Sequence, residues 1–108
     1  MLLTTTSSIE GKNIKEYMGI VFGEVVNGVN FINDFTAMIT NFTGGRSSEY
    51  EQELVDARAN ALKEMMQRAE KIGANAVIGV KFDYEPITIG DHGTMLTIMV
   101  SGTAVVVE

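Results

Sequence analysis

The sequence predicts an α+β fold in one domain, residues 1–108, with two helices packed on one side of an antiparallel or mixed sheet. Apolar residues recur at helical spacing through 31–42 and 48–72, which predicts two helices. Apolar and polar residues alternate through 77–85 and from Leu96 onward, which predicts two strands. Two earlier strands complete the sheet.

Composition and charge narrow the classes of function. The chain has 108 residues and a formal net charge of −6, which argues against nucleic-acid or anionic-membrane partners. Cysteine is absent, which excludes disulfides, thiolate metal sites and a cysteine nucleophile. The first residues carry no signal-peptide pattern, and no apolar run is long enough to span a membrane. We therefore expect a cytoplasmic protein.

The N-terminal part predicts two strands. Leu2–Ser7 reads as a short edge strand, and Tyr17–Val26 is a nearly continuous β-rich run. Such a run is typical of a strand buried on both faces. Gly19 and Gly23 recur on one face of it, where glycine either admits the close approach of another element or marks a bulge.

Two helices should follow. The first is expected over Phe31–Phe42, capped by Asn30 and ended by Gly44-Gly45. The second begins with a capping-box pattern and is expected over Ser48–Ile72, with Gly73 as its stop.

The C-terminal part predicts a hairpin whose loop is Gly90-Asp91-His92-Gly93. Its first strand should turn one set of side chains to one face, namely Ile78, Val80, Phe82 and Tyr84. The opposite set, which should face water, is Lys81, Asp83 and Glu85. On its second strand, one face should carry Leu96, Ile98, Val100, Gly102, Ala104 and Val106. The other face should carry Thr97, Met99, Ser101 and Thr103.

The second helix has an apolar arc of roughly 200°, whereas packing on a single sheet needs little more than 100°. At about 1.5 Å per residue the helix is also roughly 36 Å long, more than so small a domain can cover. Self-association through the second side of the arc explains both features. The arc contains Tyr50, Leu54, Val55, Ala57, Ala59, Ala61, Leu62, Met65, Met66, Ala69 and Ile72.

Arg58 interrupts this arc and has no close carboxylate on its own helix. Because a guanidinium keeps its charge, Arg58 must be paired across the fold or an interface, or must reach water. A structural ion pair is favoured over an anion-binding role, and the candidate partners are Glu24, Asp34, Asp83 and Glu85. Arg68, by contrast, has Glu64 four residues earlier and predicts an ordinary ion pair on the helix surface.

Arg46 lies in Gly44-Gly45-Arg46-Ser47-Ser48, directly before a helix N-terminus, where free backbone N–H groups and a cation could hold a carboxylate or phosphate. The segment lacks the lysine of a P-loop and does not follow a strand, so a loop with a helix cap is the favoured interpretation.

Two further patterns bear on chemistry. His92 and Asp91 could share a metal ion, but one histidine and one carboxylate cannot close a zinc site, so other chains would have to add ligands. An exposed hairpin turn is the favoured interpretation. Asp83 and Glu85 could act as acid and base from one strand face, although most such pairs are simply solvated.

Several segments, taken in order over nearly the whole chain, resemble the YbjQ-like family. They are Gly28 to Phe35, Gly44-Gly45-Arg46-Ser47, Tyr50-Glu51-Gln52-Glu53-Leu54, Ala57-Arg58, Gly73-Ala74-Asn75-Ala76-Val77-Ile78-Gly79-Val80, Asp83-Tyr84-Glu85 and Val100-Ser101-Gly102-Thr103-Ala104-Val105. The family has no established activity and carries a heavy-metal-binding label. The resemblance implies a dodecin-like subunit that assembles into a ring, commonly a homopentamer.

The metal label finds little support in the residues. Family members often carry a cysteine where this sequence has Met18, and a basic residue where Asn33 stands. Without a thiolate, a soft-metal site would have to use methionine, histidine and carboxylates. The resemblance also places Arg46, Tyr50, Arg58 and Asp83 in a shared pattern, which makes them candidate ligand-binding or subunit-boundary residues.

Three hypotheses follow. The first is a cytoplasmic homo-oligomer, a homopentamer, that binds a small anionic ligand or serves as a scaffold. The second is a metal-binding protein that uses His92, Asp91 and methionines, with a divalent or soft metal ion as its ligand. The third is an enzyme of unknown reaction with Asp83 and Glu85 as acid and base.

Overall fold

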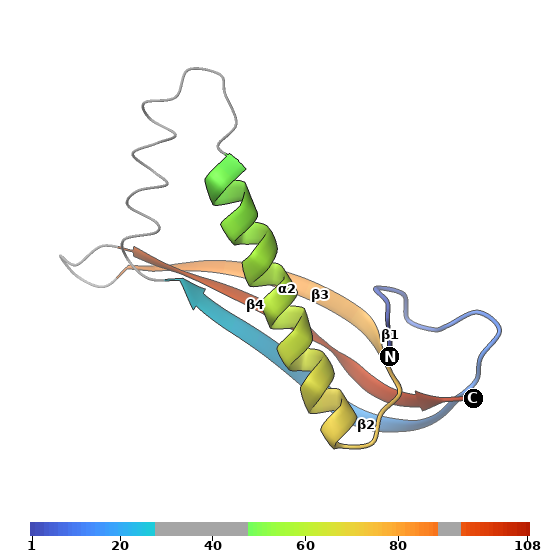
Figure 1. Cartoon of the computed structure of the whole chain (residues 1–108). Helices are drawn as coiled ribbons and strands as arrows, with labels where there is room; N and C mark the ends of the chain where they lie inside the picture. Colours follow the sequence, from blue (N-terminus) through green and yellow to red (C-terminus); the bar gives the residue numbers. More distant parts are fainter. Residues whose placement is uncertain (28–47, 89–93) are drawn as a thin grey trace.

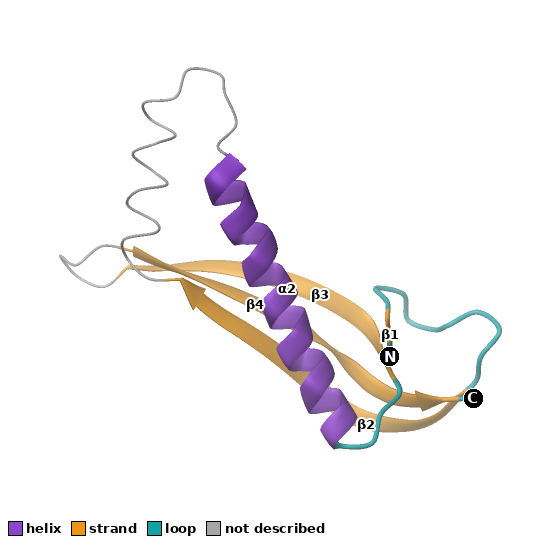
Figure 2. Cartoon of the chain, viewed as in Figure 1, coloured by secondary structure: helices purple, strands orange, loops and turns teal. Residues whose placement is uncertain are grey.

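The computed structural model describes residues 1–27, 48–88 and 94–108. These residues form four strands and one helix, drawn in Figures 1 and 2. The elements are β1 (Leu2–Leu3), β2 (Ile14–Asn27), α2 (Ser48–Lys71), β3 (Ala76–Thr88) and β4 (Thr94–Val107). The α+β prediction is confirmed. The predicted first helix and the predicted hairpin loop lie outside the described residues.

The sheet has the order β1-β3-β4-β2. Strand β1 pairs with β3 in parallel, whereas β4 pairs with both β3 and β2 in antiparallel, so the sheet is mixed. Strand β1 is shorter than the predicted Leu2–Ser7, although the chain stays in contact with β3 beyond it: Thr4 exchanges backbone hydrogen bonds with Val77 and Val80, and Thr6 accepts one from Gly79.

Strand β2 lies at an edge of the sheet, and the prediction that it is buried on both faces is wrong for this chain. Among its large apolar side chains, Tyr17, Ile20, Phe22 and Val26 are 46 to 71% exposed. The reason is that α2 covers only one face of the sheet (Figure 2), and a continuous apolar run does not reveal whether anything covers the other.

Strand register divides the side chains between two faces, because directly paired residues point the same way. The helix face packs against α2 and includes Val21 and Gly23 of β2, Val77 of β3, and Val100 and Ala104 of β4. The opposite face, called the open face below, carries Ile20, Phe22, Glu24 and Val26 of β2, Thr97, Met99, Ser101 and Thr103 of β4, and Lys81, Asp83, Glu85 and Ile87 of β3. The predicted alternation along the last strand is confirmed.

A bulge in β3 changes the predicted facing of Ile78. The register shifts between Ile78 and Lys81, where Gly79 has φ 62°. As a result Val80 packs on the helix face, whereas Ile78 belongs to a second cluster with Ala76, Val105 and Val107. The prediction that Ile78 points the same way as Val80 is therefore wrong, because one extra residue reverses the alternation.

Helix α2 buries a narrow stripe against the sheet. Ala57, Ala61, Met65 and Ala69, spaced four apart, are at most 4% exposed. Figure 1 shows the helix crossing the sheet obliquely, with its Lys71 end beside β2. The helix begins where predicted and ends one residue early. The second side of the predicted apolar arc stays uncovered, since Val55 is 45% exposed.

The two glycines singled out in β2 serve the two purposes predicted for them. Gly23 faces α2, and a β-carbon there would lie 2.9 Å from the carbonyl carbon of Ala61 and 3.0 Å from the amide nitrogen of Met65. Gly19 follows a register shift after Tyr17 and has φ 117°, as a bulge requires. The first glycine admits the helix, and the second bends the strand.

Candidate functional site

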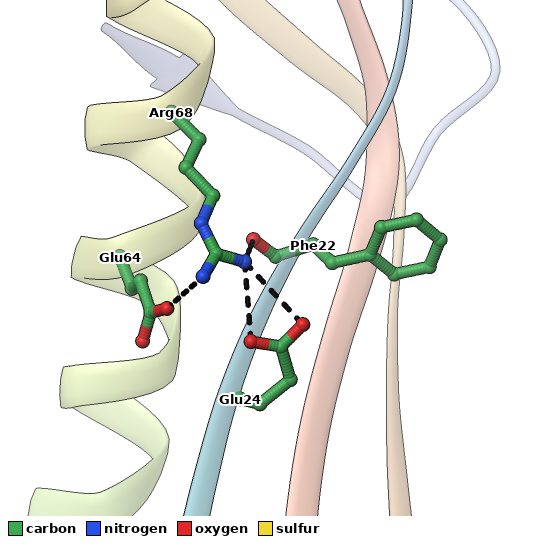
Figure 3. A network of polar contacts seen from close by, with 4 residues as sticks. All are labelled: Phe22, Glu24, Glu64 and Arg68. Atoms are coloured by element: carbon green, nitrogen blue, oxygen red, sulfur yellow. Dashed lines mark hydrogen bonds and ion pairs between the residues drawn. The ribbon is translucent and has the colours of Figure 1, made fainter.

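The most connected polar group described is Arg68, on the last turns of α2 beside the outer edge of β2. Its Nη1 donates to the backbone carbonyl of Phe22 at 2.8 Å and to Glu24 Oε2 at 3.1 Å. Its Nη2 donates to Glu64, one helical turn earlier. Figure 3 shows the guanidinium between the two carboxylates, with the Phe22 ring directed away from it. Arg68 therefore ties the helix to the edge strand.

The structure corrects how the sequence distributes ion pairs. The predicted pair of Arg68 with Glu64 is confirmed. Glu24, a predicted candidate partner of Arg58, instead pairs with Arg68. Periodicity shows which residues share a helix face, but it does not show which strand carboxylate lies opposite. The link from Arg68 to Glu24, 44 residues apart, therefore left no signal in the sequence.

Arg58 is exposed and makes no ion pair or hydrogen bond with any described residue. Asp83 lies 3.8 Å from Lys81 Nζ, and no described contact joins Arg58 to Glu85. The Arg58 side chain is exposed to water. Its other candidate partner, Asp34, lies outside the described residues.

The other predicted site residues are not brought together in the described structure. Asp83 lies on the open face of β3, and its side chain is 52% exposed. Tyr50 belongs to the first turn of α2, but its side chain is outside the description. Arg46, Asp91 and His92 also lie outside the described residues. An anion site around Arg46 and Arg58 and a metal site around His92 therefore stay predictions.

Within residues 1–27, 48–88 and 94–108, no group of three or more histidine, cysteine, aspartate or glutamate side chains could hold a metal ion. The register does align Met99 between Glu24 and Asp83 of the flanking strands, all on the open face. Both carboxylates already have cationic neighbours, Arg68 and Lys81. A metal ion bound there would have to compete with these cations.

The open face combines exposed apolar side chains with one unpaired hydroxyl. Phe22 and Val26 are 46% and 56% exposed there. In the next strand, Thr97 Oγ1 is buried and has no hydrogen-bond partner in the described part of the chain. Asp83 and Glu85, the predicted acid and base, lie on this face and are both exposed. The open face thus has an apolar row along β2, with mostly hydroxyl side chains on β4 and mostly charged side chains on β3 beside it.

A hollow of about 390 Å³ lies beside the N-terminal segment. Its polar groups largely bind one another: Thr4 Oγ1 lies 2.8 Å from Thr6 Oγ1, and Thr6 donates to the carbonyl of Ser8. Glu10 is the one charged side chain that lines it among the described residues. The hollow therefore lacks converging groups for a ligand. No described helix is both long and apolar enough to cross a membrane.

Comparison with known proteins places this fold among uncharacterised relatives. A model of the YbjQ family, described as "Putative heavy-metal-binding", matches residues 1–108. A UPF0145 protein of Clostridium botulinum (strain Eklund 17B) is 60% identical over 108 residues, all of both chains. One from Acetivibrio thermocellus is 57% identical over the same span, and one from Listeria ivanovii is 58% identical over all of this chain and 96% of its own.

A solved structure supports the same fold. The crystal structure of a DUF74-family protein of unknown function from Pediococcus pentosaceus matches with a TM-score of 0.61. The match covers 100% of this chain and 98% of that one, at 15% sequence identity. At that identity, the likeness speaks for the fold alone.

Proposed function

The chain belongs to the YbjQ family. We propose that it acts as a cytoplasmic homo-oligomer, a homopentameric ring that binds a small ligand or serves as a scaffold. The observation that carries the proposal is the uncovered apolar row on β2. Tyr17, Ile20, Phe22 and Val26 are 68%, 71%, 46% and 56% exposed. Single exposed apolar residues are common, but a row along one strand marks an interaction surface.

A second uncovered strip supports the same proposal. Val55, Ala59, Leu62 and Met66 line the flank of α2 next to its buried stripe. Val55 and Ala59 are exposed, whereas Met66 and Leu62 are half-buried, Leu62 against the cluster on the helix face. Spacing of three and four residues is the pattern by which one helix packs on another element. Ala59 would let a neighbouring backbone come close. Two apolar surfaces on different sides of one chain suit contacts between unlike surfaces, which close into rings.

The ligand proposed for this assembly is a small anion held at a subunit boundary by Arg46, Tyr50 and Arg58. What supports it is the exposed guanidinium of Arg58, which has no carboxylate partner among the described residues, on an otherwise apolar helix flank. Guanidinium groups bind carboxylates and phosphates through two parallel hydrogen bonds. A neighbouring copy would remove water from this contact and so strengthen it.

Native mass spectrometry tests the assembly. We expect the untagged protein to show five times the 11.7 kDa chain mass, together with any retained ligand. Ile20→Ser should shift the population towards smaller species, because Ile20 is the most exposed apolar side chain on β2. Glu70→Ser, an exposed residue on the polar side of α2, is the matched control and should keep the parent mass.

Arg58→Glu tests the boundary placement in the same measurement. A reversed charge on the helix flank should break the ring, whereas Lys63→Glu, on the polar side of the same helix, should leave it intact. A monomeric parent protein would refute the proposed assembly. An intact, equally stable Arg58→Glu ring would remove Arg58 from the boundary.

Metal binding is the second candidate, favoured by the description of the family. The ligands would be His92, Asp91 and methionine thioethers, and a thioether favours Cu(I). Equilibrium dialysis against Zn²⁺, Ni²⁺ and Cu(I) tests it, with His92→Ala as the comparison. Retention of a metal ion that His92→Ala abolishes would support this function, whereas no retained metal would exclude it.

A further inference from the structure

The outer edge of β2 offers backbone groups to another strand. The carbonyl of Phe22 accepts from Arg68 and therefore points away from β4. In an antiparallel pair, the backbone N–H and C=O groups of successive residues alternate between bonding the partner strand and pointing away from it. The backbone groups of Ile20, Glu24 and Val26 therefore also point away from β4, and such residues are called outward residues below. The side chains of these outward residues all lie on the open face. A carbonyl oxygen has two lone pairs, so Phe22 can accept a second hydrogen bond, and a strand added here would lie beside the Arg68 guanidinium or displace it.

Among residues 1–27, 48–88 and 94–108, only the start of the outer edge of β3 has a partner strand. Val80 donates its N–H to the carbonyl of Thr4 at 3.0 Å, so Val80 points outward from β4. By the same alternation the backbone groups of Phe82, Tyr84 and Pro86 point outward, and no described strand pairs with them. Pro86 has no N–H, so at that position the edge offers only a carbonyl to a partner strand. The side chains of these outward residues lie on the helix face, the reverse of the arrangement in β2.

The hydrogen-bond directions along β4, the strand between β2 and β3, are consistent with both sets of outward residues. Val100 is opposite both Gly23 and Phe82. The backbone N–H and C=O of Gly23 bond to β4, because those of its neighbours Phe22 and Glu24 point outward. The N–H and C=O of Val100 therefore point towards Gly23 and away from Phe82, which leaves Phe82 free to bond a strand on its other side.

The side chains of outward residues lie on the open face in β2 but on the helix face in β3, and this difference decides in which direction the two edges could pair. In antiparallel pairing outward residues stand opposite outward residues, so joining β2 to the β3 of another copy would make the open face of one continuous with the helix face of the other. In parallel pairing an outward residue stands beside an inward one, which is a residue whose backbone groups bond the neighbouring strand of its own sheet. Phe22 would then neighbour an inward residue such as Asp83, and both belong to the open face. Only parallel pairing keeps every α2 on the same side.

Chain direction favours the same arrangement. Strands β2 and β3 both run antiparallel to β4, so they run parallel to each other within one chain. A second copy related by rotation about an axis along the strands therefore meets β2 with a parallel β3. Repeating this contact between unlike edges closes a ring, whereas pairing β2 with β2 of another copy would stop at a dimer.

We propose that copies of this chain join by parallel addition of the free β3 edge, Lys81–Thr88, to the β2 edge, Ile20–Asn27, of the next copy. The sheet then continues from copy to copy, with α2 on one side and the open face on the other. This inference rests on the proposed homo-oligomer and adds the surface through which it forms.

Cysteine cross-linking tests the inference, because the natural sequence contains no cysteine. Val26→Cys is combined in turn with Asp83→Cys, Glu85→Cys and Ile87→Cys, all on the open face. Within one chain Val26 and Glu85 are two strand spacings apart, about 9.6 Å, and the other two pairs are farther apart, so all three are beyond the reach of a disulfide. After oxidation, we expect at least one pair to give a ladder of covalent oligomers on a non-reducing gel. Each single-cysteine variant should stay monomeric on that gel.

The matched control is Val26→Cys with Tyr84→Cys, since Tyr84 is exposed but its side chain lies on the helix face. A ladder from this pair would mean antiparallel addition, and a covalent dimer from Val26→Cys alone would mean pairing of two β2 edges. Either result overturns the proposal. So does the absence of any ladder when native mass spectrometry shows an oligomer. A monomer in that spectrum would instead refute the proposed function itself.

Discussion

Gly23 and Ala61 bring the edge strand and the helix into backbone contact. A β-carbon on Gly23 would overlap the carbonyl oxygen of Ala61. Ala61 is itself completely buried, so the helix cannot simply tilt away without losing its own packing. The separation between α2 and β2 is therefore set by the absence of a side chain at one position.

Gly23→Ala should destabilise the protein by about 3 kcal/mol, at the upper end of the usual cost of overpacking. The clash is with main-chain atoms, which cannot rotate out of the way. Chemical denaturation at fixed protein concentration measures the free energy of unfolding. Gly11→Ala is the control, since a β-carbon there meets nothing within 4 Å and only its φ of 82° is unfavourable. Equal losses in both variants would contradict the close contact.

Met65→Ala should cost about 2 to 5 kcal/mol of unfolding free energy, as expected when a buried methionine is truncated. Met65 is 0% exposed and belongs to the cluster on the helix face. Met66→Ala makes the same chemical change one residue later, where the side chain is only half-buried, and should cost clearly less. Thermal unfolding of the pair checks the order. The reverse order would mean that α2 is rotated about its axis.

Arg68→Gln should lower the unfolding free energy by about 1 kcal/mol, because surface ion pairs contribute little even when several groups meet. The Arg68 side chain is 45% exposed, so salt should weaken its contribution further. Unfolding is compared in low and high salt. Lys71→Gln, an exposed base on the last turn of α2, is the control. A loss for Arg68→Gln that does not change with salt would mean that its charge is unimportant.

Gly79→Asn should be tolerated better than Gly79→Ala. Gly79 has φ 62° in the β3 bulge, and a β-carbon there meets nothing within 4 Å. The cost is therefore conformational, about 1 to 2 kcal/mol for alanine and less for asparagine, which tolerates the left-handed region. Differential scanning calorimetry distinguishes the two variants. An alanine variant as stable as the parent protein would show that the bulge relaxes.

The sequence predicted the structural features that depend on residues close together along the chain. The bounds of α2 and the alternation of Ile98, Val100 and Ala104 in β4 are local patterns, and both are confirmed. Three features were not predicted. The bulge at Gly79 adds one residue and reverses the facing of Ile78, and a glycine in a strand does not by itself announce a bulge. The bond from Arg68 to Glu24 depends on tertiary position. The exposed face of β2 belongs to the same continuous apolar run that a strand buried on both faces would have, so the sequence does not distinguish the two cases.

The candidate site was predicted less well than the fold. Arg58 was recognised as a charge on an apolar flank, and the structure finds it exposed. The sequence could not show whether Arg58 pairs with a carboxylate, because an ion pair between distant residues leaves no periodic signal. Of the candidate site residues Arg46, Tyr50, Asp91 and His92, none has a described side chain, so their roles stay predictions.

The strand order has a consequence for synthesis of the chain. Strand β4 is the last of the four to be translated, yet it is the strand that holds β2 and β3 together. Ile14 pairs with Val107, so almost the whole chain must emerge before the sheet can close. At about 5 to 20 residues per second on the ribosome, β2 waits several seconds with its apolar edge unpaired. Nascent chains are therefore most open to mispairing during this wait, and chaperone contacts should concentrate on residues 14–27.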